Sequence, residues 1–129
     1  MNDRINVKNL IFLACVLTAF NAEAAPQDAL NLYQQQGAEA ADVQLGEKLW
    51  NTNFGDRSCS SCHGKDLKAM GAHEKTKKPI KPMALSVNAE RYQKTKKIEK
   101  WFLRNCKWTF GRECNAQEKT NLLSWLISQ

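Results

Sequence analysis

The stretch Cys59-Ser60-Ser61-Cys62-His63 decides how this chain is interpreted. The pattern C-x-x-C-H is typical of c-type haem attachment. Two thiols at this spacing add to the two vinyl groups of one porphyrin, and the next residue turns its imidazole toward the iron. The motif therefore predicts one covalently bound haem c, held by Cys59 and Cys62, with His63 as the proximal ligand.

A zinc site and a thioredoxin-like dithiol use the same C-x-x-C spacing. Zinc needs two further ligands, but Cys106 and Cys114 lack the close spacing of a zinc knuckle. A thioredoxin-like site needs a βαβ unit, and the sequence indicates no convincing strand. The haem interpretation also explains His63. We expect Cys106 and Cys114 to form a disulfide.

Residues 1–24 have the form of a secretory signal peptide. Two basic residues precede an apolar run over 10–20, and an Ala-Glu-Ala cleavage signal follows. The run is shorter than the about 20 apolar residues that span a bilayer, so no permanent membrane insertion is expected. The sequence thus predicts export to the periplasm, an oxidising compartment that favours disulfides, and one cytochrome c domain over 25–129.

The remaining pattern predicts an all-α fold around the haem. A helical region is expected over 28–53, interrupted near Gly37. Pro79 and Pro82 keep the segment 75–86 out of helix, because proline cannot donate a backbone hydrogen bond and restricts its predecessor.

Two more helices are expected after this loop. One covers 89–104 with Asn88 as a plausible N-cap. The last begins at Asn115, which forms a capping box with Glu118. Leu122, Trp125 and Leu126 then face the core.

Gly46 lies inside the first helical region, on one face with Val43 and Trp50. A glycine in a helix costs about 1 kcal/mol relative to alanine. It either marks a close crossing with another helix or is simply tolerated.

The positive charge is concentrated in one part of the chain. The whole sequence carries +6, and the segment 65–107 holds thirteen Lys and Arg against four acids, a net charge of +9. A one-sided cationic surface speeds the encounter with an acidic partner, although most charge runs are only solvated. Nucleic acid is not expected as a partner outside the cytoplasm.

The order of these elements resembles the class I cytochromes c. In that fold the distal iron ligand comes from the chain after the middle helix, yet no Met or His follows Met83 here. The polar candidates in that segment are Asn105, Lys107 and Asn115. Asn105 continues the apolar stripe of the middle helix, so it either binds the iron or ends the helix in a left-handed conformation.

The resemblance to the sphaeroides haem protein family is closer and covers essentially the whole mature chain. It rests on Pro79-Ile80-x-Pro82-Met83-Ala84, Ser86-Val87-Asn88, Glu99-Lys100-Trp101-Phe102 and Arg104-Asn105-Cys106 with Gly111-Arg112-Glu113-Cys114. Members are high-spin monohaem cytochromes c in which an asparagine beside a disulfide ligates ferric iron. The resemblance implies that Asn105 has this role, and that a dihaem cytochrome c delivers the electron.

The sequence therefore predicts a protein that accepts an electron, releases Asn105 and binds O₂, NO or CO at the haem iron. An ordinary one-electron carrier with a permanently six-coordinate haem is the first alternative. A haem enzyme that converts O₂ or NO is the second. Electron transfer and gas binding are favoured over a defined catalytic turnover, because the distal segment offers no evident acid–base residue beyond Lys107, Arg112 and Glu113.

Overall fold

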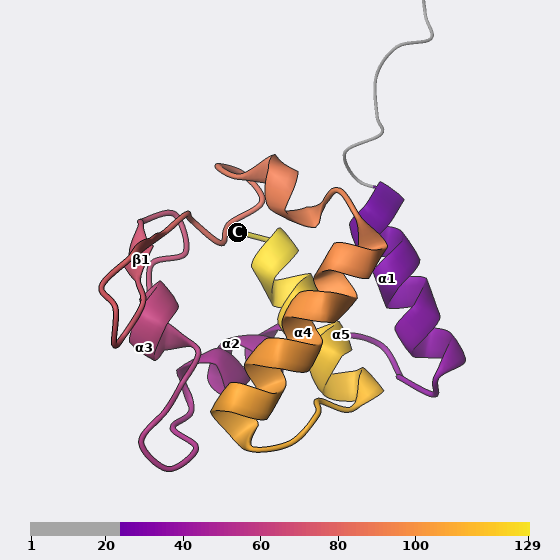
Figure 1. Ribbon diagram of the computed structural model, residues 1–129. Helices are drawn as coiled ribbons and strands as arrows, with labels where there is room; N and C mark the ends of the chain where they lie inside the picture. Colours follow the sequence, from indigo (N-terminus) through magenta and orange to yellow (C-terminus); the bar gives the residue numbers. More distant parts are fainter. Residues whose placement is uncertain (1–23) are drawn as a thin grey trace, which may run out of the picture.

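The computed structural model describes residues 24–129, which pack together mainly as helices (Figure 1). The elements are α1 Ala24–Gln35, α2 Val43–Asn51, α3 Ser60–His63, β1 Gly71–Ala72, β2 Pro79–Ile80, the 3₁₀ helix η2 Ala89–Tyr92, α4 Thr95–Phe110 and α5 Ala116–Ile127.

The signal peptide expected over 1–24 lies outside the described residues except for Ala24, where α1 begins. Within 24–129, none of the helices combines the length and apolarity needed to cross a bilayer.

Helix α5 packs against both α1 and α2, and α1 also packs against α4. The predicted capping box is present, since the Asn115 side chain accepts from the Glu118 backbone and the Glu118 side chain accepts from the Asn115 backbone. Leu122, Trp125 and Leu126 are buried as predicted. The local sequence of α5 therefore determines both where the helix begins and which face enters the core.

Gly46 marks a close crossing of α2 and α5, one of the two alternatives that the sequence left open. A Cβ atom at this position would overlap the carbonyl oxygen of Asn121 and lie 2.8 Å from Cβ of Trp125. Trp50 of the same face is buried, but Val43, one turn before Gly46, is 40% exposed.

We expect Gly46→Ala to lower the free energy of unfolding by about 2 kcal/mol. The alanine gains about 1 kcal/mol of helix propensity, but the clash with the backbone of α5 forces the helices apart, at a cost of about 3 kcal/mol. Chemical denaturation measures the difference. Gln44→Ala, an exposed change in the same helix, is the control. Equal stability of the two variants would contradict the close crossing.

The segment between α3 and η2 is a loop with one short hairpin. Gly71 pairs with Ile80 and Ala72 with Pro79, antiparallel. The backbone N–H groups of Met83 and Ala84 both donate to the carbonyl of Leu67, at 2.9 Å. The segment 75–86, called the proline loop below, therefore lies beside the chain that leaves α3, on the same side of the molecule.

The middle helix differs from its predicted bounds of 89–104. Residues 89–92 form the separate 3₁₀ helix η2, and α4 begins at Thr95 and continues to Phe110. Asn88 does not cap a helix; its side chain donates to the carbonyl of Pro82 at 2.8 Å. Gly111, with φ +70°, supplies the left-handed residue after the last turn. Asn105 is therefore inside the helix and does not terminate it.

Candidate functional site

The C-x-x-C-H motif forms α3 and the residue before it. Ser58 and Ser61 fix this turn, because the backbone N–H of each donates to the other's side-chain oxygen, at 3.0 and 3.1 Å. Gly64, with φ +77°, ends the helix directly after His63. Neither Cys59 nor Cys62 takes part in a disulfide.

Two neighbouring residues hold His63 in place. The ring of Trp50 packs against the imidazole with centroids 5.2 Å apart, and its indole N–H donates to the carbonyl of Gly64 at 3.0 Å. Gly71 of β1 passes so close that a Cβ atom there would lie 2.9 Å from Cα of His63. The motif is thus enclosed by α2 on one side and β1 on the other.

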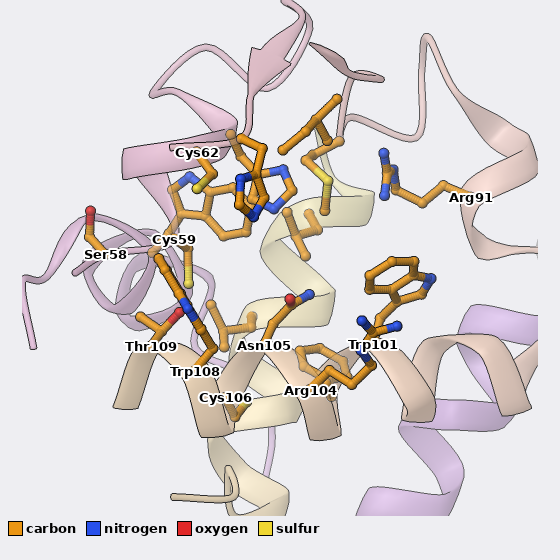
Figure 2. A pocket seen from close by; sticks show the side chains of 18 of the residues that line it. Ser58, Cys59, Cys62, Arg91, Trp101, Arg104, Asn105, Cys106, Trp108 and Thr109 are labelled. Carbon is orange, nitrogen blue, oxygen red and sulfur yellow. The ribbon is translucent and has the colours of Figure 1, made fainter. Parts of the chain in front are cut away.

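A cavity of about 510 Å³ opens in front of this motif (Figure 2). That volume is within the range of cofactor pockets, about 300–1,000 Å³. Its wall is mainly apolar, with Trp50, Ile80, Met83, Tyr92, Ile98, Trp101, Phe102, Trp108, Phe110, Leu122, Leu123 and Leu126 among the lining residues.

The imidazole of His63 is neutral at physiological pH. Burial, with a smaller contribution from the charge of Arg91, lowers its pKa to about 4. Its Nδ1 atom is buried and has no hydrogen-bond partner within residues 24–129. A neutral imidazole is the form that binds a metal.

Burial also raises the pKa of the Cys59 thiol to about 11. Two thiols and a neutral imidazole on the wall of a large apolar cavity fit a covalently attached haem.

Asn105 enters this cavity from α4 (Figure 2). Its amide points into the cavity, while Cys59 and Cys62 line the cavity from the side of α3. Its side chain makes no hydrogen bond to any other residue in 24–129. The Asn105 side chain is exposed to the cavity, and a cofactor that fills this mainly apolar cavity would bury its amide and leave it in need of a partner.

The other two candidate ligands are used elsewhere. Lys107 does not line the cavity and forms an ion pair with Glu113 at 3.1 Å. Asn115 caps α5, accepting from the Glu118 backbone at 2.8 Å. Of the three candidates, the cavity contains only Asn105.

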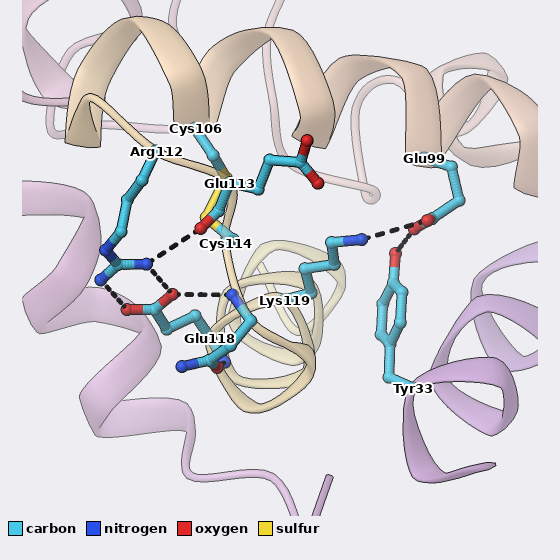
Figure 3. Close-up of a disulfide and its surroundings, with 9 residues drawn as sticks. Tyr33, Glu99, Cys106, Arg112, Glu113, Cys114, Glu118 and Lys119 are labelled. Atoms are coloured by element: carbon cyan, nitrogen blue, oxygen red, sulfur yellow. Dashed lines mark hydrogen bonds and ion pairs between the residues drawn. A yellow bond between two sulfur atoms is a disulfide. The ribbon is translucent and has the colours of Figure 1, made fainter. Parts of the chain in front are cut away.

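The predicted disulfide joins Cys106, the residue after Asn105, to Cys114, with Cα atoms 5.6 Å apart (Figure 3). The connection from α4 to α5 is also held by Arg112, whose guanidinium contacts both carboxylate oxygens of Glu118 at 2.8 Å. This bidentate pair lowers the pKa of Glu118. The bridge and the ion pair together fix the end of α4 that carries Asn105.

The sequence matches, over residues 36–126, a family described as a domain of unknown function, DUF1924. It is 33% identical over 126 residues to the cytochrome c-type protein SHP of Cereibacter sphaeroides, covering 92% of this chain and 97% of that one. The chain belongs to the DUF1924 family and to the sphaeroides haem protein family. It is also 29% identical over 96 residues to cytochrome c'' of Methylophilus methylotrophus, covering 70% and 67% of the two chains.

Solved structures give the same result for the fold. Oxidised SHP, an oxygen-binding cytochrome c, superposes with a TM-score of 0.74 at 34% identity, covering 81% of this chain and 96% of that one. Oxidised cytochrome c'' superposes with a TM-score of 0.71 at 28% identity, covering 84% and 94%. The prediction of an all-α, class I cytochrome c fold is confirmed. The chain is a monohaem cytochrome c, and its cofactor is haem c.

A polar cluster lies beside the site. Tyr33 of α1 donates to Glu99 of α4, and Lys119 of α5 pairs with Glu99 at 3.1 Å (Figure 3). Burial, followed by the contact with Glu99, raises the pKa of Tyr33 well above its usual range. The cluster ties three helices together, while Phe102 stands between Tyr33 and the cavity, its ring centroid 6.2 Å from that of Tyr33.

Several lining residues were not predicted as part of the site. The cavity is also lined by Met83, Arg91, Tyr92, Trp108 and His73. Met83 belongs to a motif shared with the family, but no sequence motif marks the other four as part of a haem site. Tyr92 donates to the carbonyl of Met83 at 2.5 Å. Met83 lies on the wall of α3, because its loop is bonded to Leu67. Asn105, by contrast, lines the cavity from α4.

Proposed function

We propose that Cys59 and Cys62 hold the haem by thioether bonds, that His63 is the proximal ligand and that Asn105 is the distal ligand of the oxidised protein. The observation that carries this proposal is the unpartnered amide of Asn105, which points into the cavity from the interior of α4. Haem c supplies an iron that cycles between the ferric and ferrous states and takes a diatomic gas at an open axial position.

The chemistry of the amide supports release on reduction. A neutral amide oxygen is a hard, weak donor and suits ferric iron better than ferrous iron. We infer that Asn105 leaves when the protein accepts an electron, and that O₂, NO or CO then takes its place. Related proteins support this inference: SHP is an oxygen-binding cytochrome c, and the solution structure of cytochrome c'' addresses haem-ligand detachment.

The position that Asn105 vacates has an apolar wall. Trp101 and Phe102 lie one turn before Asn105 in α4, and Trp108 lies one turn after it; all three line the cavity. These three side chains offer a small neutral gas an apolar surface and no acid–base group, and Arg104, beside Asn105, is exposed and stacks on Trp101. This favours binding over turnover.

The ordinary carrier is the weaker alternative. It requires a strong distal ligand that stays bound in both states, and no residue after Met83 is Met or His. The test is a comparison of the absorption spectra of the oxidised and reduced protein. We expect high-spin features in both, with loss of one axial ligand on reduction. A low-spin six-coordinate spectrum in both states would support the carrier instead.

We further propose that the protein works in the periplasm, as a mature domain over 25–129, and receives its electron from a redox partner with an acidic surface, for example a dihaem cytochrome c. The signal-peptide pattern and the disulfide support the location. The net charge of +9 over 65–107 supports the partner.

Charge reversal on the loop between β1 and β2 should slow electron delivery. Lys75 and Lys77 are exposed in this loop, and Lys78 beside them lines the cavity. We expect Lys75→Glu with Lys77→Glu to lower the bimolecular rate constant of reduction about tenfold at low ionic strength, since steering accounts for factors of about 10–1,000. Stopped-flow mixing with the partner measures this.

The matched control is Lys48→Glu, an exposed change in α2 outside the basic segment. Its rate constant should stay near that of the wild type. The difference between the variants should disappear at 1 M salt, where charges more than about 3 Å apart are largely screened from each other. Equal rates for both variants at low salt would contradict steering by this loop.

A further inference from the structure

The cavity wall carries positive charge and no negative charge. Its lining residues include Lys78, Arg91 and Arg104, and no Asp or Glu of the part of the chain that the structure describes. An uncompensated charge beside an apolar cavity is costly. The wall therefore fits an anionic group inside the cavity.

Arg91 is the cation held most firmly at this wall. Its Nε donates to the carbonyl of Pro82 at 3.1 Å, and its Nη2 donates to the carbonyl of Lys81 at 2.7 Å. The side chain is half-buried, and burial lowers the pKa of the guanidinium. No carboxylate of residues 24–129 pairs with it.

The two hydrogen bonds from Arg91 to backbone carbonyls leave some of its N–H groups without a partner among the described residues. A guanidinium has five N–H donors in a rigid fork, and those on Nη1 have no protein partner within 24–129. By contrast, Arg104 is exposed and stacks 5.3 Å from the ring of Trp101, and Lys78 is also exposed. Arg91 is thus the one of these three cations that is both partly buried and fixed in place.

The position of Arg91 points to the identity of the anion. Figure 2 shows Arg91 on the side of the cavity opposite Cys59 and Cys62. In haem c the two propionate carboxylates lie on the ring edge opposite the vinyl carbons that form the thioethers. A haem attached to Cys59 and Cys62 therefore presents its carboxylates toward Arg91.

We propose that Arg91 binds a haem propionate and thereby raises the reduction potential of the protein. This inference rests on the proposed attachment site. A cation beside the propionate offsets part of the negative charge of the cofactor, and reduction adds one more negative charge to it. Arg91 is thus a positioning and charge-compensating residue, distinct from the iron ligands.

The test is spectroelectrochemical titration of the holoprotein. Arg91→Gln should lower the equilibrium constant for reduction about tenfold, which is 59 mV for a one-electron couple. Arg91→Lys keeps the charge and should stay within about threefold of the wild type. Asn88→Ala is the matched control, because Asn88 donates to the same Pro82 carbonyl but carries no charge. Its potential should not change.

Two results would overturn the proposal. One is an Arg91→Gln potential equal to that of Asn88→Ala; the other is an equal shift in Arg91→Gln and Arg91→Lys. If Arg91→Gln does not mature with haem, Arg91→Lys is compared with the wild type by resonance Raman spectroscopy. A propionate bending band at the same position in both proteins would overturn the proposal. Loss of covalent haem in the wild type would instead contradict the proposed function.

Discussion

Changing both Cys59 and Cys62 to alanine is expected to abolish the covalent haem. The thioether bonds require these two thiols, and the other two cysteines of the described chain are joined in a disulfide. On a denaturing gel stained for haem, the wild-type band should remain with the polypeptide and the band of the double variant should be absent.

The double variant should also lose most of its folded structure. A cavity of about 510 Å³ separates α3 from α4, and a domain of this size has little other core to compensate for the missing group. Circular dichroism should therefore show a large loss of helix. Ser60→Ala, a change between the two cysteines, is the control and should keep both haem and helix. A haem-stained band in the double variant would contradict the attachment site.

Asn105→Ala is expected to open the oxidised iron to external ligands. If the amide occupies the distal position only in the ferric state, its removal should raise the ferric affinity for azide at least tenfold. The ferrous affinity for CO should stay within about twofold, because the amide has already left in that state. Optical titration of each oxidation state measures both affinities.

The two other polar candidates serve as controls. Lys107→Ala removes an ion pair outside the cavity and should leave the ferric spectrum unchanged. Asn115→Ala removes an N-cap and should cost about 1 kcal/mol of stability, again with no spectral change. Superimposable ferric spectra and equal azide affinities for the wild type and Asn105→Ala would exclude Asn105 as the ligand.

Local signals in the sequence predicted the parts of the site that depend on neighbours in the chain. The C-x-x-C-H motif occupies one short helix and the residue before it, and the capping box of α5 spans four residues. Gly46 was also a useful signal, because a glycine inside a helix needs a reason and the crossing with α5 supplies it.

The parts that depend on tertiary contacts were harder to predict. The end of α4 was placed at residue 104, but packing of Cys106 and Thr109 into the interior extends the helix to Phe110. This extension matters for function, since it places Asn105 within a regular helix. The role of Arg91 could not be read from the sequence, because an isolated arginine in a basic segment looks like solvated surface. Its side chain is partly buried because η2 packs against the proline loop, where Arg91 donates to the carbonyls of Pro82 and Lys81.

The most direct test of the central claim is the absorption spectrum of the reduced protein before and after addition of CO. The account predicts a ferrous protein that has already released Asn105, so CO should bind without a slow ligand-dissociation step and shift the Soret band. A reduced protein with a low-spin spectrum that CO leaves unchanged would contradict the account, because it would mean that the sixth position stays closed.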